Sequence, residues 1–244
     1  MGVSSFRVVT DSKALPSTMR ALVVDTGSVP VAVRINTDRE AREPRVDLRM
    51  VNSSRAAANP LMVATESDNT RITLRGESSS FLDWGRAGEL TLVLPPDLAR
   101  RLAVTTQQGN GVVLLNADLD QLIARTGNGE AVLRGSARRI EIHTENGDVV
   151  TRDPISVSES FSAQTSNGDI EVDLKDAAPR TVEAASENGD VIIAVPERGP
   201  YVVNASTENG QTAIRVPRAT DRENAAAVIT VRSANGDVIV DDLR

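Results

Sequence analysis

The dipeptide Asn-Gly recurs at near-regular intervals through the second part of this 244-residue chain. It begins at residues 110, 128, 146, 167, 188, 209 and 235, so the spacings are 18, 18, 21, 21, 21 and 26 residues. A period near 20 residues is typical of a solenoid, in which each repeat is one supersecondary unit that packs on its neighbours. This repeat constrains the fold more than any other feature of the sequence.

Apolar and polar residues alternate on both sides of each Asn-Gly. Apolar residues such as Val182 and Ala184 stand six and four positions before the asparagine, and others stand three and five positions after it. Alternation with a period of two predicts half-buried strands, so each repeat should hold two strands joined at the Asn-Gly. The expected interior stack includes Ile170, Val172, Val191, Ile193 and Ile214.

Two folds share this pattern. Asn-Gly between alternating strands is also the strongest short signal for a β-hairpin. In a meander of hairpins, however, Glu145 would face Asp148 and Glu187 would face Asp190, and like charges directly opposite each other are destabilising. The pattern therefore favours a solenoid in which Asn-Gly turns a corner and each strand pairs with its equivalent one coil away.

The predicted fold class is all-β, a parallel β-helix or solenoid with coils of about 18–21 residues that is degenerate at its N-terminal end. Residues 1–19 are expected to be a lead-in, residues 20–100 degenerate β-repeats with an inserted loop near residues 77–89, and residues 101–244 regular repeats. Within the degenerate part, "VATESDNTRITL" from Val63 to Leu74 is expected to occupy the same strand columns.

The asparagines are expected to form a structural turn ladder, because stacked side-chain amides can hydrogen-bond to one another. Its members are Asn110, Asn128, Asn146, Asn167, Asn188, Asn209 and Asn235. If the corners stack in sequence order at roughly 4.8 Å per coil, Asn110 and Asn235 should lie about 29 Å apart. A Thr or Ser two positions before most of these asparagines should point inward and satisfy amides of the turn.

An aspartate follows the glycine in four repeats, at Asp148, Asp169, Asp190 and Asp237. Stacked carboxylates repel each other, and a hard cation such as calcium would relieve that repulsion. The repeat nevertheless differs from the glycine-rich nonapeptide of calcium-binding β-rolls. We therefore expect solvated corner residues, with no metal or cofactor required.

The inventory of reactive residues argues against the common enzyme classes. The chain has no cysteine, and its one histidine, His143, should face solvent, so a catalytic triad or a His/Cys metal site is not expected. Residues 141–244 hold 19 acidic and 9 basic residues, against 15 and 18 in residues 1–140, and an acidic surface binds nucleic acid poorly. The clustered acids Glu171, Asp173 and Asp176 are expected on outward-facing strand positions, which predicts solvation rather than catalysis. Phe81 and Trp84, in "FLDWG", are the one concentration of aromatic residues and a candidate contact patch, although a local plug is the simpler interpretation.

The run "LTLVLPPDLARRLAVTTQQGNGVVLLNADLDQLIARTGNGEAVLRG" resembles bacterial β-strand-repeat proteins of unknown function that are labelled putative adhesins. The likeness extends from about residue 85 to 244, and more loosely from residue 20. The resemblance implies a β-helical solenoid in an extracytoplasmic location, often behind an N-terminal membrane anchor that would lie outside this sequence. It implies no catalytic residues.

The sequence thus predicts a non-enzymatic cell-envelope solenoid that serves as an interaction or scaffold module, with an envelope protein or a polysaccharide as partner. A polysaccharide-active β-helical enzyme and a self-assembling filament are the alternatives, because acids are abundant and solenoid ends expose strand edges. Asp241 and Asp242 follow the last strand, so they are expected to guard the end of the solenoid and to keep the protein a monomer or a small homo-oligomer.

Overall fold

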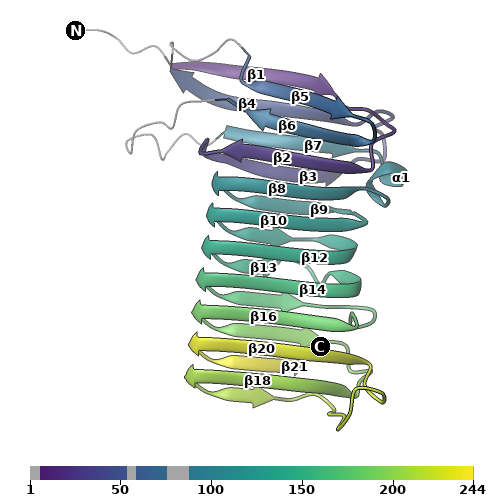
Figure 1. The fold of residues 1–244 in the computed structure, drawn as a ribbon, viewed down its shortest axis with the longest axis vertical. Helices are drawn as coiled ribbons and strands as arrows, with labels where there is room; N and C mark the ends of the chain where they lie inside the picture. The colour runs from purple at the N-terminus through teal and green to yellow at the C-terminus, as the bar shows by residue number, and fades with distance from the viewer. Residues whose placement is uncertain (1–5, 54–58, 76–87, 244) are drawn as a thin grey trace, which may run out of the picture.

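A computed structural model describes residues 6–53, 59–75 and 88–243 of the chain. These residues form two β-sheets that face each other and continue through a stack of coils (Figure 1). The sheet nearest the viewer in Figure 1 is here called the front sheet and the other the back sheet.

In spatial order, the front sheet consists of β5 (Leu61–Glu66), β6 (Asn69–Leu74), β2 (Ala21–Gly27), β8 (Ala103–Asn110), β10 (Gln121–Asn128), β12 (Gly135–Asn146), β14 (Ser156–Asn167), β16 (Thr181–Asn188), β20 (Ala227–Asn235) and β18 (Tyr201–Asn209). The back sheet consists of β1 (Phe6–Ala14), β4 (Arg45–Ser53), β7 (Gly88–Leu94), β3 (Val31–Thr37), β9 (Val113–Asp118), β11 (Ala131–Leu133), β13 (Val149–Thr151), β15 (Ile170–Asp173), β17 (Val191–Val195), β21 (Val238–Asp242) and β19 (Thr212–Ile214). A single-turn helix, α1 (Pro96–Ala99), leads from β7 to β8.

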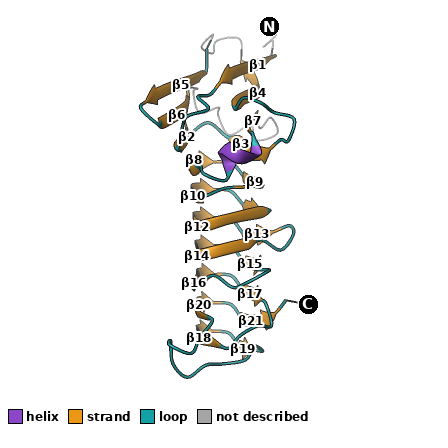
Figure 2. Ribbon diagram, turned by 90° about the vertical axis from the view of Figure 1, so that its right-hand side faces the viewer, coloured by secondary structure: helices purple, strands orange, loops and turns teal. Residues whose placement is uncertain are grey.

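Each regular strand pairs in parallel with its equivalent in the next coil. In β10 and β12, for example, Leu122 lies beside Ile140 and Asn128 beside Asn146. Each Asn-Gly joins a front strand to a back strand at one edge of the solenoid, here called the corner edge, and longer connections return along the opposite loop edge (Figure 2). The parallel solenoid is therefore confirmed, and the meander of Asn-Gly hairpins is wrong.

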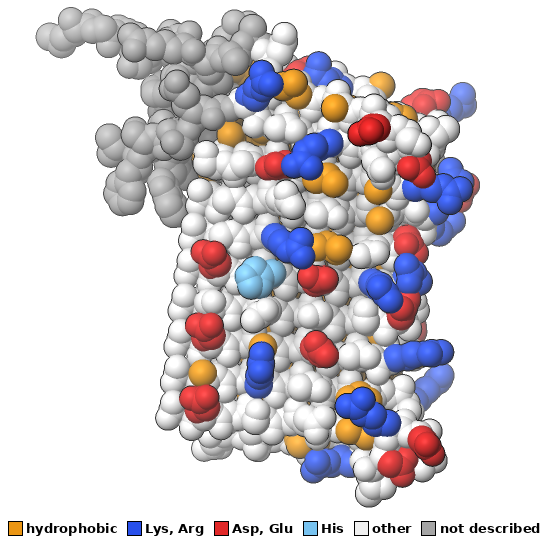
Figure 3. Space-filling view, viewed as in Figure 1, with side chains coloured by type: hydrophobic (Ala, Val, Ile, Leu, Met, Phe, Trp, Pro, Cys, Tyr) orange, Lys and Arg blue, Asp and Glu red, His pale blue; other side chains and the backbone are white. Residues whose placement is uncertain are grey.

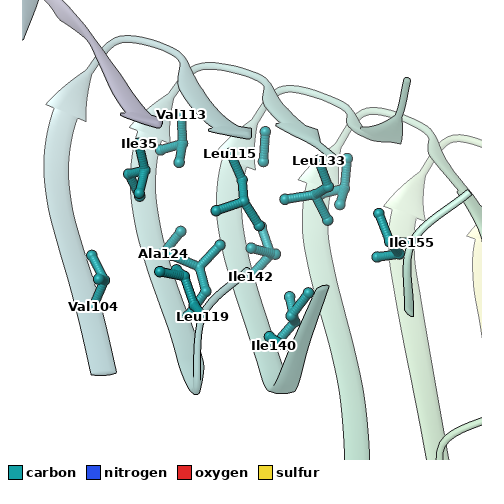
Figure 4. Close-up of a cluster of buried hydrophobic side chains, with 14 of the residues drawn as sticks. Ile35, Val104, Val113, Leu115, Leu119, Ala124, Leu133, Ile140, Ile142 and Ile155 are labelled. Atoms are coloured by element: carbon teal, nitrogen blue, oxygen red, sulfur yellow. The ribbon is translucent and has the colours of Figure 1, made fainter. Parts of the chain in front are cut away.

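The core is the thin layer of branched and small aliphatic side chains between the two sheets. Figure 4 shows part of it, with Val104, Ile140 and Ile142 from the front sheet and Leu115 and Leu133 from the back sheet. Ile170, Val172, Val191 and Ile193 are fully buried, as the alternation predicted. Ile214, the fifth expected member, is only partly buried because its coil ends the stack.

The N-terminal part departs from the regular pattern at one stretch. Residues 63–74 were expected to follow the coil columns, but β5 and β6 form an antiparallel hairpin that turns at Ser67, whose φ is 57°. By contrast, β2 and β3 pair in parallel with β8 and β9 and so form a true coil. The boundary near residue 100 stays a prediction, and most of the loop expected at residues 77–89 lies outside the described residues.

The C-terminal coils do not stack in sequence order. The last coil, β20 and β21, lies between the coil of β16 and β17 and the coil of β18 and β19 (Figures 1 and 2). Asn235 is therefore the sixth corner and Asn209 the seventh, so the expectation that Asn235 ends the column is wrong. Asp241 and Asp242 lie on an interior strand and cannot guard the end of the solenoid.

Candidate functional site

The seven asparagines at the corner edge form an unbroken ladder of side-chain hydrogen bonds. Each Nδ2 donates to the Oδ1 of the preceding corner at 2.8–3.0 Å, in the spatial order Asn110, Asn128, Asn146, Asn167, Asn188, Asn235 and Asn209. The glycine that follows each asparagine lets neighbouring corners come close: a Cβ on Gly189 would lie 2.0 Å from the carbonyl oxygen of Gly168.

The inward Thr and Ser hydroxyls complete the corner in a way that differs from the prediction. They donate to glycine carbonyls of the neighbouring coil rather than serving turn amides, as in Thr165 Oγ1 to Gly147 O at 2.9 Å and Ser186 Oγ to Gly168 O at 2.8 Å. The hydroxyls therefore satisfy carbonyl oxygens that the corner would otherwise bury without a partner.

The four aspartates after the glycines, here called the aspartate column, have a backbone partner of their own. The Oδ1 atoms of Asp148 and Asp169 accept the backbone N–H of Asp169 and Asp190 at 2.8 Å, and Asp190 and Asp237 continue the series. Each carboxylate thus caps an amide that the turn removes from the sheet ladder. The residues of the corner edge therefore have a structural role, and Asn-Gly is repeated because every coil makes the same turn with the same hydrogen bonds.

His143 lies on the outer surface of the front sheet, as predicted, beside a shallow trough of about 570 Å³. The trough exists because Gly27, Gly109 and Gly127 occupy neighbouring strands and leave no side chains there. Next to it, Arg125 pairs with Glu141 at 3.3 Å. This surface offers hydrogen-bonding groups but no reactive cluster.

The acids singled out in the sequence do not converge. Glu171 and Asp173 project outward from β15, as expected, but β15 ends at Asp173, so Asp176 lies in the exposed turn that follows and not on a strand. Among the described residues, no group of three or more His, Cys, Asp or Glu side chains is placed to hold a metal ion. Phe81 and Trp84 lie outside the described residues.

A groove of about 490 Å³ lies at the loop edge, where the connections after the back strands meet α1. Its charged lining residues are Arg39, Arg100, Arg134, Lys175, Asp118 and Asp153. Sequence reasoning missed this site, because its members come from loops of different lengths that only the stacking of coils brings together. Charged side chains gather along this edge, the right-hand margin of Figure 3.

The charges of this groove are unevenly matched. Arg134 pairs with Asp153 at 2.9 Å, and Arg100 pairs with Asp97 at 3.0 Å. Arg39 and Lys175 form no ion pair with any residue in the described ranges. The loop-edge groove is therefore a locally basic surface on a chain whose net charge is −7.

A second charged group on the loop edge is internally neutralised. Arg138 bonds to both Asp120 and Glu159, and Arg139 also bonds to Glu159. Hydrogen bonds from Arg139 and then Arg138 lower the pKa of the Glu159 carboxyl, while Asp120 and Glu159 raise the pKa of Arg138. Since its charges already have partners, this network ties neighbouring coils together rather than offering a free site.

In the described part of the chain, no helix is long and apolar enough to cross a membrane.

Comparisons with known proteins agree with this architecture. Residues 141–241 match the Toastrack DUF4097 family, whereas no curated protein matches the chain. A putative adhesin from Bacteroides fragilis is similar over 99% of this chain and 100% of its own, with 12% identity and a TM-score of 0.54. A putative adhesin from Parabacteroides distasonis is similar over 96% and 97%, with 10% identity and a TM-score of 0.55.

A putative lipid binding protein from Parabacteroides distasonis has the same fold, with 11% identity, a TM-score of 0.52 and coverage of 95% of this chain and 96% of its own. At such identities the likeness shows the fold alone. Over residues 141–241 the chain is thus similar to the Toastrack DUF4097 family, and the whole chain shares its β-solenoid fold with bacterial proteins that are called putative adhesins.

Proposed function

We propose that this protein is a non-enzymatic interaction module of the cell envelope that binds an anionic polysaccharide at the loop-edge groove. The observation that carries the proposal is the pair of cations, Arg39 and Lys175, that line the groove without a carboxylate partner among the described residues. Carboxylate or phosphate groups of a polysaccharide would supply the missing partners, because charge-assisted hydrogen bonds are the stronger ones. The adhesin names of proteins with this fold support an extracytoplasmic role.

The shape of the site supports binding rather than catalysis. The groove is open at the surface, and its two carboxylates are already engaged: Asp153 with Arg134, and Asp118 with the hydroxyl of Ser136 at 2.8 Å. A glycosidase of the usual kind needs two free carboxyl groups that flank one sugar linkage. The module would sit on the outer side of the membrane, and an anchor upstream of this sequence would hold it there.

The test is calorimetric titration of the protein with an oligogalacturonate, and with neutral dextran as the ligand control. We expect the oligogalacturonate to bind and the double variant Arg39→Ala, Lys175→Ala to bind about tenfold more weakly, because two charge-assisted contacts are lost. Lys13→Ala removes the only other lysine, which lies on β1, and should leave binding unchanged.

Binding should also weaken as salt is added, because salt screens exposed charges. Equal affinity for dextran and oligogalacturonate, or an unchanged affinity in the double variant, would contradict the proposal.

A further inference from the structure

The coil of β18 and β19 ends the solenoid with an open interior. Val203 is buried, but the next inward side chains, Ala205 and Thr207, are partly exposed, and Thr212 on β19 is exposed. The equivalent positions one coil away are buried, as Val231 and Val238 show. The apolar layer between the sheets therefore reaches the surface at this end.

The outer edge of β18 is closed at its beginning and open beyond. Tyr201 donates its N–H to Pro217 O at 2.8 Å and accepts from the N–H of Ala219 at 2.7 Å, so residues 217–219 cover the first rung. The Arg218 guanidinium donates to Val203 O at 3.4 Å. Backbone groups alternate along a strand, so those of Ala205 and Thr207 point the same way as those of Tyr201. In the described part of the chain, no strand pairs with this stretch of edge.

We propose that this edge is a homodimer interface, in which β18 pairs antiparallel with β18 of a second copy about a two-fold axis near Ser206. Both sheets would then continue from one molecule into the other, and the two open interiors would cover each other. A two-fold contact closes on itself, so the product is a dimer and not a filament.

The side chains of this edge suit a second copy in particular. The outward residues near the proposed axis, Asn204 and Ser206, are small and uncharged, so two copies meet there without like-charge repulsion. Antiparallel pairing brings Glu208, near the end of β18 in each copy, toward the start of β18 in the other copy, where Arg218 lies. Arg218 forms no ion pair with a described residue, and Glu208 likewise, so the two charges are complementary across the axis.

The opposite end of the solenoid is built differently and does not match this edge. There the outermost described strands, β1 and β5, pair antiparallel with β4 and β6. Stacking the C-terminal end on the N-terminal end would therefore interrupt the parallel arrangement and its asparagine ladder. The symmetric contact joins two identical edges and avoids this mismatch.

The test is sedimentation equilibrium of the wild type and of charge variants over a range of protein concentrations. We expect the wild type to dimerise, Glu208→Arg to raise the dimer dissociation constant at least about tenfold, and Glu208→Arg combined with Arg218→Glu to restore it. Ala205→Pro removes a backbone N–H that points to the free edge of β18, and it breaks no hydrogen bond to β20, so it should also weaken the dimer. Glu187→Arg, the equivalent change on interior strand β16, is the matched control and should have no effect.

Thermal unfolding of each variant distinguishes loss of the interface from loss of the fold. A wild type that stays monomeric at the highest concentration would overturn the proposal. So would a dimer whose dissociation constant is unchanged in Glu208→Arg and in Ala205→Pro, or long fibres in place of a closed dimer.

Discussion

Replacing Gly189 with alanine tests whether close approach of neighbouring corners holds the coils at their spacing. The added methyl group would lie 2.0 Å from the carbonyl oxygen and 2.6 Å from the carbonyl carbon of Gly168. These atoms belong to the backbone, so the corner must open. The hydrogen bond from Gly189 N to Asn235 O, 2.9 Å long, would then be strained or lost.

The expected cost follows from two contributions. A residue held in an unfavourable backbone conformation costs about 1–3 kcal/mol. Loss of one hydrogen bond adds about 0.5–1.5 kcal/mol. We therefore expect Gly189→Ala to lower the free energy of unfolding by about 2–4 kcal/mol.

Gly27→Ala is the matched control, because Gly27 has a φ of +55° but nothing lies within 4 Å of its added methyl group. It should cost only about 1–2 kcal/mol, the penalty of a left-handed conformation. Urea unfolding followed by circular dichroism measures both variants against the wild type. A Gly189→Ala variant that is no more destabilised than Gly27→Ala would show that close approach of the corners does not hold the coils at their spacing.

Four further outcomes test the architecture. Ile193→Asp, which buries an unpaired charge, should cost several kcal/mol, and Glu183→Ala on the outer face should stay within about 0.5 kcal/mol; equal melting shifts would overturn the register. Asn188→Ala removes two rungs of the ladder, of 3.0 and 2.9 Å, and should cost about 1–2 kcal/mol in the same unfolding assay. Calcium should leave the melting temperature unchanged, whereas a site in the aspartate column would add about 2.7 kcal/mol at 100 times its dissociation constant. The two arginine partners of Glu159 lower its pKa in the folded state. The stability that Glu159 contributes is therefore present above its unfolded pKa of about 4.3, and it is lost as the pH falls through the lower folded pKa. Over that pH range, the Glu159→Gln variant should lose less stability than the wild type.

The regular part of the fold could be predicted because its constraints repeat in the sequence. Alternation identified buried residues such as Val172 and Ile193, and like charges beside the corners argued against hairpins. The stretch from Val63 to Leu74 misled the prediction, because a degenerate coil and a true hairpin share the same alternation and only the pairing partner differs.

The loop-edge groove could not be predicted for a different reason. Arg39 and Lys175 are far apart in the chain, and they line one groove only because the coils between them stack and bring their loops to the same edge. No spacing in the sequence encodes this shared groove, since the loops differ in length from coil to coil. The corner residues, by contrast, were visible because every coil meets the same neighbours.

The order of the C-terminal coils follows from which coil is better suited to be buried. The coil of β20 and β21 contributes Val231 and Val238, both fully buried, where the coil of β18 and β19 offers Ala205 and Thr212. Placing the more apolar coil inside buries roughly two extra methyl groups at Val231 alone, or about 1.6 kcal/mol at 0.8 kcal/mol per carbon. It also leaves the hydroxyl of Thr212 in water, where burial would have required a partner. The chain must pass from the outermost coil, β18 and β19, back to the coil of β20 and β21, and the 26-residue spacing between Asn209 and Asn235 supplies the longer connection. Residues 217–219 of that connection cover the start of the exposed edge of β18. Thr212 is the one polar residue among those that stand three positions after a corner asparagine. It was thus the sequence signal for the end of the solenoid.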